Sequence, residues 1–194
     1  MQQVVLATGN AGKVAEMQAK LESLGFRVVP QSEFHIPEAI EDGLTFIENA
    51  LKKARHACEL TGLPAIADDS GLEVRALHGA PGIHSSRYAD GQGDAANNEK
   101  LLAALAGVKD RRARFQCVIV YMRHALDPTP IICQGSWQGE ITDAPSGSAG
   151  FGYDPLFFIP DQGCTAAALS PEIKKSLSHR AQALTQLQQA LNHL

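Results

Sequence analysis

The first 30 residues contain a strand, a helix and a second strand in immediate succession, and this order constrains the fold more than any other feature. Val4 to Ala7 is a short β-prone run. From Lys13 to Leu24 apolar residues recur at a helical spacing that ends at Gly25, and Phe26 to Val29 has the composition of a strand. This order predicts a βαβ unit with a parallel strand pair at the centre of the sheet.

The later segments predict a mixed sheet. Thr45-Phe46-Ile47-Glu48 is a capping box that opens a helix, and apolar side chains continue at core-facing spacing until Gly62. Two β-prone segments, Arg114 to His124 and Ile131 to Gly139, flank an Asp-Pro-Thr-Pro sequence and predict a hairpin. We therefore expect an α/β fold with a mixed central β-sheet flanked by helices.

Shorter elements complete the predicted order. Strands are expected at Ala65 to Ala67 and Leu72 to Val74, on either side of a turn at Asp68 to Gly71, and a helix from Asp94 to Ala106. Ser170-Pro171 starts a short helix. The last predicted helix carries on one face Leu184, Leu187, Leu191 and Leu194.

Composition limits the classes of partner. The 194 residues carry 17 Lys and Arg against 21 Asp and Glu, so the formal net charge is −4. Nucleic-acid binders usually have a pI above about 9, so we expect no nucleic-acid partner. A small anionic substrate stays open, because it needs a few placed cations or amides and not a positive net charge. We see no basic leader and no apolar run near the roughly 20 residues of a membrane span, and expect a cytoplasmic protein with no membrane partner. The cysteines, expected to be reduced and buried, are Cys58, Cys117, Cys133 and Cys164.

The first candidate site lies where the first strand meets the first helix. Thr8-Gly9-Asn10-Ala11-Gly12-Lys13 combines glycines, a helix N-terminus with unpaired N–H groups, and a cation, all of which favour phosphate binding. It is not a Walker P-loop, because the spacing differs and Val14 follows Lys13. A Gly-rich strand-to-helix turn without a ligand is the alternative.

The second candidate is Asp68-Asp69-Ser70-Gly71, which places adjacent carboxylates after a short apolar run. On an extended segment these side chains point opposite ways, so one can bind metal while the other faces different groups. An ordinary turn is the alternative.

The third candidate is the acidic loop from Glu38 to Asp42, in which Glu41 can be a second magnesium ligand. A solvated loop is the alternative. On the helix that follows, Lys53 can reach a bound phosphate, and an ordinary exposed lysine is the alternative there.

Two further candidates lie near the C-terminus. The first is Ser148-Ala149-Gly150-Phe151-Gly152-Tyr153-Asp154-Pro155, in which aromatic residues on a Gly-rich loop suit stacking on a planar base. Asp154 can either accept a hydrogen bond from the base or brace the loop. A hydrophobic loop anchor is the alternative. The segment from Lys174 to Arg180 places cations at a helix start, where they oppose the helix dipole and favour a nearby anion or electron-rich ligand.

These blocks, in this order, resemble the inosine triphosphate pyrophosphatase family, in particular its bacterial dITP/XTP pyrophosphatases. The resemblance covers nearly the whole chain. It is carried by Leu6-Ala7-Thr8-Gly9-Asn10 with Gly12-Lys13, Gly43-Leu44-Thr45-Phe46-Ile47-Glu48-Asn49-Ala50, Ala67-Asp68-Asp69-Ser70-Gly71-Leu72, Gly79-Ala80-Pro81-Gly82-Ile83, Ser86-Arg87-Tyr88, Gly150-Phe151-Gly152-Tyr153-Asp154-Pro155 and Ser178-His179-Arg180.

The resemblance implies a Mg²⁺-dependent hydrolase that converts ITP, dITP and XTP to the nucleoside monophosphate and pyrophosphate, and that forms a homodimer. It implies that Asp69 is the catalytic base, with Lys53 also in the catalytic group, and that metal is held by Asp69, Glu41 and Asp68. The implied substrate-binding residues are Thr8, Gly9, Asn10, Ala11, Gly12, Lys13, Ser70, Phe151, Gly152, Tyr153, Asp154, Lys174, His179 and Arg180.

We therefore expect residues 1–194 to form one α/β domain whose two lobes, without a separate linker, form a substrate cleft. Donors from His179 and Arg180 suit the 6-oxo group of the substrate purines and disfavour the 6-amino group of adenine. A purine-nucleotide-binding regulator without catalysis is an alternative, which the intact Asp68-Asp69-Ser70-Gly71 sequence opposes. A phosphotransferase is a weaker alternative, because the Walker sequence is missing.

Overall fold

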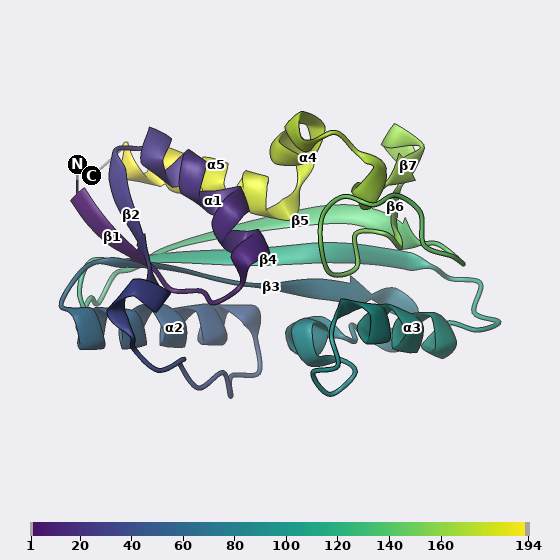
Figure 1. Ribbon diagram of the computed structural model, residues 1–194, viewed down its shortest axis with the longest axis horizontal. Coiled ribbons are helices and arrows are strands. Elements are labelled where there is room, and N and C mark those ends of the chain that lie inside the picture. The colour runs from purple at the N-terminus through teal and green to yellow at the C-terminus, as the bar shows by residue number, and fades with distance from the viewer. Residues whose placement is uncertain (1, 193–194) are drawn as a thin grey trace. The chain divides into compact units, whose positions relative to one another are not determined.

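The computed structural model describes residues 2–192 and shows an α/β chain with a seven-stranded sheet (Figure 1). In chain order the strands and α-helices are β1 (Gln2–Leu6), α1 (Ala11–Ser23), β2 (Phe26–Pro30), α2 (Phe46–Thr61), β3 (Ala65–Val74), α3 (Asp94–Ala104), β4 (Arg112–Met122), β5 (Ile131–Ile141), β6 (Phe157–Ile159), β7 (Cys164–Thr165), α4 (Pro171–Leu177) and α5 (His179–Leu191).

The sheet is mixed, which confirms the predicted class. Its strand order is β2-β1-β3-β4-β5-β6-β7. Strand β1 pairs in parallel with β2 and with β3, whereas β6 pairs antiparallel with β5 and β7. The predicted parallel pair β1–β2 exists. Its predicted place at the sheet centre is wrong, because all the other strands lie on the β1 side of β2 and β2 is therefore an edge strand.

The expected turn at Asp68 to Gly71 is also wrong, because these residues lie inside the continuous strand β3. Turn composition is a local preference. Here the carboxylates of Asp68 and Asp69 find partners on neighbouring helices, described below, and the extended backbone lets the two side chains point opposite ways. Helix α1 begins two residues before the predicted Lys13, because Asn10 caps it by accepting a hydrogen bond from the Lys13 N–H at 3.1 Å.

The other predicted elements are present with small shifts at their ends. The capping box is confirmed: Thr45 Oγ1 accepts from the Glu48 N–H at 3.2 Å, while the Glu48 carboxylate accepts from the Leu44 N–H at 2.8 Å. Strands β4 and β5 are neighbours in the sheet, as a hairpin requires. Ser170 caps α4 as predicted. In α5, Leu184 and Leu187 are buried, and the predicted Leu194 lies outside the described residues.

The chain divides into two compact units. The first comprises residues 1–69, 117–135 and 180–194, and the second comprises residues 70–116 and 136–179. Among the described residues no helix is both long and apolar enough to cross a membrane. All the cysteines carry free thiols; Cys164 is half-buried and the others are buried.

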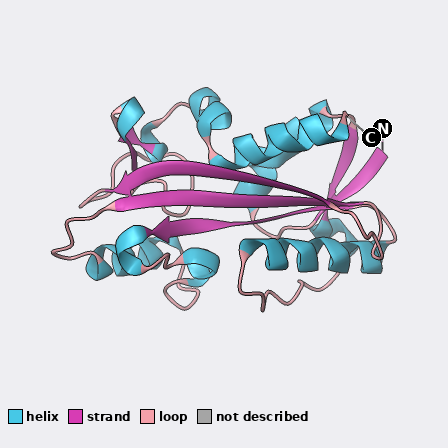
Figure 2. Ribbon diagram, turned by 180° about the vertical axis from the view of Figure 1, so that it is seen from behind, coloured by secondary structure: helices cyan, strands magenta, loops and turns pink. Residues whose placement is uncertain are grey.

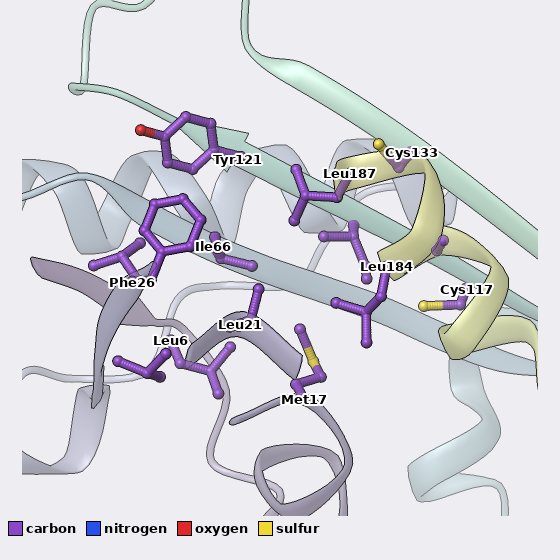
Figure 3. Packing of buried hydrophobic residues seen from close by; sticks show 14 residues of the cluster. Leu6, Met17, Leu21, Phe26, Ile66, Cys117, Tyr121, Cys133, Leu184 and Leu187 are labelled. Carbon is purple, nitrogen blue, oxygen red and sulfur yellow. The ribbon is translucent and has the colours of Figure 1, made fainter. Parts of the chain in front are cut away.

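The first unit has a core on each face of its strands, with α1 and α5 covering one face and α2 the other (Figure 1). Met17 and Leu21 of α1 and Leu184 and Leu187 of α5 pack together on the first face (Figure 3). On the second face α2 presents small residues, which let the helix approach the strands closely: Ala50, Ala54, Ala57 and Cys58.

The second unit has one continuous core, to which α3 contributes Leu101 and Leu105. Helices α3 and α4 lie on opposite sides of its strand segments (Figure 2). Phe157 of β6 is fully buried, with ring centroids 4.5 Å from Phe115 and 5.5 Å from Trp137. Aromatic packing of this kind fixes the strands from which the loops of this unit emerge.

Candidate functional site

In the first unit the chemistry is organised on β3, whose consecutive carboxylates point toward different helices. Asp68 Oδ2 lies 3.2 Å from Lys13 Nζ at the start of α1, and Asp69 Oδ1 lies 3.4 Å from Lys53 Nζ on α2. These helices cover opposite faces of the strands (Figure 1). The strand alternation predicted for adjacent aspartates is therefore confirmed within a strand instead of a turn.

Asp68 is the centre of a buried charge cluster. Its side chain is fully buried, and besides Lys13 it accepts hydrogen bonds from Arg180 Nη2 at 3.2 Å and Nε at 3.4 Å. Arg180 is only 2% exposed and also pairs with Glu16 of α1. Burial alone would raise the pKa of Asp68, but the charges of Lys13 and Arg180 outweigh burial and hold it well below its usual range. Asp68 is therefore a permanent anion at neutral pH.

Asp69 has a different electrostatic environment. Burial raises its pKa, and the nearby charges of Glu41 and Asp68 add to this shift, against the lowering by Lys53 and Lys13. A carboxylate with a raised pKa is a better proton acceptor than an ordinary aspartate. Two adjacent carboxylates with pKa values pushed apart have the signature of divided roles.

Lys53 lies between the second carboxylate and the acidic loop. Its Nζ is 3.2 Å from Glu41 Oε1 as well as 3.4 Å from Asp69 Oδ1. Burial alone would lower the pKa of Lys53, but the carboxylates of Asp69, Asp68 and Glu41 raise it. Lys53 is thus a cation at neutral pH, with 11% of its side chain exposed. The alternative of an ordinary exposed lysine does not describe it.

The acidic loop is tied to the start of α2 around Glu41. The Gly43 N–H donates to Asn49 Oδ1 at 2.9 Å, and Lys52 pairs with Asp42. Glu38 is exposed, whereas Glu41 is half-buried against Lys53. The structure therefore places Glu41, and not Glu38, with the aspartates of β3.

The Thr8 to Lys13 turn has the predicted form of a helix start. Thr8 is buried, and its Oγ1 accepts from the Asn10 N–H at 3.2 Å. Ala11 and Gly12 form the first helical positions of α1, so their N–H groups have no intrahelical acceptors. With Lys13 beside them, these groups can bind an anion.

In the second unit the loop from Phe151 to Asp154 is braced by its own side chains. Asp154 Oδ2 accepts from the Phe151 N–H at 2.9 Å and from Lys174 Nζ at 2.7 Å, and Lys174 Nζ lies 5.1 Å from the Phe151 ring centroid. A side chain at Gly150 would meet Asp154 Oδ2 at 2.0 Å, at a φ of +80°. Of the two roles predicted for Asp154, the structure shows the bracing one.

The remaining predicted residues divide between the units. His179 is buried in the second unit, and its ring stacks on Phe115 at 4.8 Å between centroids, while the next residue, Arg180, belongs to the first unit. Ser70 is half-buried and begins the second unit's part of β3. The structure thus places the metal and catalytic candidates, the Thr8 to Lys13 phosphate candidates and Arg180 in the first unit. The second unit contains Lys174 and the other candidates for binding the purine.

Two partners of the site were not predicted from the sequence. Glu16, which pairs with Arg180, stands three residues after Lys13 on α1 like any helical surface charge. Phe115, which stacks on His179, is one of several apolar residues that alternate along β4. Strand alternation marks Phe115 as inward-facing, but neither residue carries a signal for its specific partner.

The first unit suits a divalent metal only if water and substrate phosphates supply some of the ligands. Among the described residues no group of three or more His, Cys, Asp or Glu side chains forms a ready-made metal cage. Glu41 and Asp69 nevertheless converge on one Lys53 nitrogen, and the buried Asp68 Oδ1 has no hydrogen-bond partner within residues 2–192. Mg²⁺ is commonly bound by one or two carboxylates together with waters and substrate phosphates, so these residues suit it.

Comparisons with known proteins agree with the resemblance seen in the sequence. The Ham1 family model matches residues 4–190. The chain is 59% identical to the dITP/XTP pyrophosphatase of Vibrio cholerae over 98% of this chain and 97% of that protein. It is 58% identical to the dITP/XTP pyrophosphatase of Shigella flexneri over the full length of both.

Solved structures give the same answer for the fold. The HAM1 protein from Coxiella burnetii superposes with a TM-score of 0.93 at 50% identity, covering all of both chains. The Staphylococcus aureus Ham1 protein superposes with a TM-score of 0.89 at 41% identity, covering 99% of each. With a family model that spans most of the sequence and relatives of this identity, the chain belongs to the Ham1 family.

Proposed function

We propose that this chain hydrolyses the non-standard purine nucleoside triphosphates ITP, dITP and XTP to the nucleoside monophosphate and pyrophosphate, and so removes them from the nucleotide pool. The observation that carries the proposal is the pairing of adjacent β3 carboxylates with different lysines, Asp68 with Lys13 and Asp69 with Lys53. Relatives named dITP/XTP pyrophosphatase supply the substrate class.

The triphosphate is assigned to the groups of the first unit. The N–H groups at the start of α1 and the ammonium groups of Lys13 and Lys53 offset the phosphate charge, and the second unit adds Lys174 by resemblance. Positive charge fixed in advance lowers the barrier to attack, because the enzyme need not reorganise it during the reaction.

Magnesium is the proposed cofactor, held by Asp69 and Glu41 with Asp68 beside them. When bound, it would neutralise phosphate charge and acidify water. The proposal rests on the carboxylate oxygens of Glu41 and Asp69, which both lie close to Lys53 Nζ.

Asp69 is the proposed base. Its carboxylate accepts a proton from the attacking water, and in the metal-free chain burial raises the pKa of this carboxyl above its ordinary value. Lys53, 3.4 Å from Asp69 Oδ1, restricts the orientation of the carboxylate. Water is the nucleophile throughout, so no covalent enzyme intermediate forms.

The purine is assigned to Ser70, the loop from Phe151 to Asp154, His179 and Arg180 on the strength of the family resemblance. Donors on His179 and Arg180 would match the 6-oxo group shared by hypoxanthine and xanthine, and would leave the 6-amino group of adenine facing another donor. A homodimer and a cytoplasmic location belong to the same proposal.

Product analysis tests the proposed reaction. The chain is incubated with Mg²⁺ and with ITP, dITP, XTP, GTP or ATP in oxygen-18 water. We expect monophosphate and pyrophosphate from the first three, with label in one of these products. Release of orthophosphate and a diphosphate contradicts the proposed bond cleavage. Tight ITP binding without turnover instead indicates a nucleotide-binding regulator.

A further inference from the structure

Two side chains of helix α3 bind Gly152, which lies in the loop from Phe151 to Asp154. One binds the N–H of this glycine and the other binds its carbonyl. The Gly152 N–H donates to Asp94 Oδ2 at 2.7 Å. The Gly152 carbonyl accepts from Asn98 Nδ2 at 2.9 Å. Both partners stand four residues apart on α3, in its first turns, and so project from the same side of the helix. One helix face thus fixes the peptide groups before and after Gly152.

Gly152 is the residue of this loop that most needs such support. It adopts a left-handed conformation, with φ of +63°, and within residues 2–192 no atom lies near the position that a Cβ would occupy. Side-chain packing therefore cannot restrain it. A glycine has more backbone freedom than any other residue, and in this loop that freedom would be used between Phe151 and Tyr153.

The residues on either side of Gly152 are anchored separately. The Phe151 N–H is bound by Asp154, and the Tyr153 hydroxyl donates to the Ser85 carbonyl at 2.8 Å. With both neighbours anchored, rotation about the Gly152 backbone can still turn Phe151 relative to Tyr153. The contacts from Asp94 and Asn98 restrict that rotation.

Helix α3 is itself firmly seated. Asn97, which lies between Asp94 and Asn98 in the sequence, is buried. Its side chain accepts from the Ala89 N–H at 2.7 Å and donates to the Ser86 carbonyl at 3.3 Å. Asn97 therefore fixes the helix to the preceding segment, and Asp94 and Asn98 transmit that rigidity to Gly152.

We propose that Asp94 and Asn98 are positioning residues for purine binding, which act by holding Gly152 so that Phe151 is presented in one orientation. The inference rests on the proposed function, since it takes this loop as the purine-binding loop. Neither residue needs to touch the substrate. A loop ordered in advance loses less conformational entropy on binding, so these residues lower KM without contributing to bond cleavage.

The test compares variants in kinetics, with inorganic tripolyphosphate as a competitive inhibitor that lacks a base. For Asp94→Ala and Asn98→Asp we expect KM for ITP to rise about five- to tenfold, the effect of one lost hydrogen bond, with kcat within twofold of wild type. The inhibition constant of tripolyphosphate should not change. Asp94→Asn keeps an acceptor oxygen, so its KM should be close to that of the wild type. Glu99→Ala, on the exposed part of the same helix, is the matched control.

Hydrogen exchange gives a readout that needs no substrate. The Gly152 amide should exchange faster in Asp94→Ala than in Glu99→Ala. If Asp94→Ala fails to fold by circular dichroism, Asn98→Asp is the deciding variant, and Asp94→Asn is its folded control. An unchanged KM in folded Asp94→Ala or Asn98→Asp, or equal rises in KM and in the tripolyphosphate inhibition constant, overturns the inference. Absence of ITP and XTP hydrolysis in the wild type overturns the proposed function instead.

Discussion

Arg180 Nη2 lies 3.2 Å from Asp68 Oδ2, and neither side chain is more than 2% exposed. An ion pair this deeply buried is stable only while both members are present, because a charge left alone in the interior has lost its hydration without compensation. The pair also holds Lys13 and Glu16 through their own contacts with Asp68 and Arg180. The pair is therefore the centre of a charge cluster in the first unit that also contains Lys13 and Glu16.

Arg180→Ala should lower the free energy of unfolding by about 3 kcal/mol, since it removes one cation that compensates the buried charge of Asp68 and leaves Lys13 beside it. Arg180→Lys keeps the charge and should lose less. Urea denaturation measures both. Arg112→Ala is the control, because Arg112 pairs with Asp110 on the surface with 58% of its side chain exposed, and it should change stability little. Similar losses for Arg180→Ala and Arg112→Ala would contradict the buried-pair interpretation.

Arg180 should also affect base selection. We expect both Arg180→Lys and any folded Arg180→Ala protein to show a smaller ratio of kcat/KM for ITP over ATP, because a donor facing the 6-oxo group is altered or lost. Steady-state kinetics with both nucleotides measures the ratio. Selectivity equal to the wild type in folded protein removes Arg180 from the base-recognition group.

The pKa values of the adjacent aspartates should diverge in the metal-free protein. Burial acts on both carboxyls, but Lys13 and Arg180 hold the pKa of Asp68 below its ordinary value, whereas that of Asp69 lies above it. On acidification Asp69 should therefore protonate first. Carbon-13 NMR of the carboxyl groups measures the order, with Asp69→Asn used to assign the signals. Protonation of Asp68 before Asp69 would refute the assignment of roles.

Asp69→Asn should nearly abolish turnover while leaving nucleotide binding measurable. The amide cannot accept the proton of the attacking water, and a lost general base typically reduces rate by about 10²–10⁴-fold. Single-turnover kinetics with ITP measures the chemical step, and calorimetry measures binding. The matched control is Asp143→Asn, an aspartate in the second unit with a 98% exposed side chain. Turnover near that of the control excludes Asp69 as the base.

Asp127 should make stability depend on acid pH. It accepts hydrogen bonds from Arg123 Nε at 2.9 Å and from the Thr129 N–H at 3.0 Å, and the Arg123 contact holds its pKa well below the usual range. A lowered folded-state pKa stabilises the protein above about pH 4, where the unfolded-state aspartate is ionised, and this contribution is lost as the pH falls further. Asp127→Asn should therefore cost about 1 kcal/mol at pH 7 and progressively less below pH 4. A difference from wild type that is constant from pH 7 to pH 3 contradicts this linkage.

Local sequence signals predicted most of the elements, because each depends on neighbouring residues. The Thr45 capping box and the Ser170-Pro171 helix start depend on residues that stand close in the sequence. The Asn10 cap is also local, but it was not predicted. The Asp68 turn was predicted on the same local basis and was wrong. Its strand conformation accompanies a partner, Arg180, that lies 112 positions away.

The candidate site shows the same division. Family motifs named the residues that carry charge in the first unit, but not their pairing. Asp94 and Asn98 could not be predicted to support the Phe151 loop, since they act on the backbone of a residue 58 and 54 positions later. A hydrogen bond to a main-chain group depends on the position of that group and not on its side chain. The residues around Gly152 therefore carry no sequence pattern that points to Asp94 or Asn98.

The position of α5 has a consequence for how the chain is made. This helix supplies Leu184 and Leu187 to the core of the first unit, yet the ribosome synthesises it after every other helix and strand described here. Residues 70–116 and 136–179, which form the second unit, all emerge earlier. Domains commonly fold from the N-terminus during synthesis. In this chain, part of the apolar surface of the N-terminal strand β1 stays uncovered until α5 has left the ribosome.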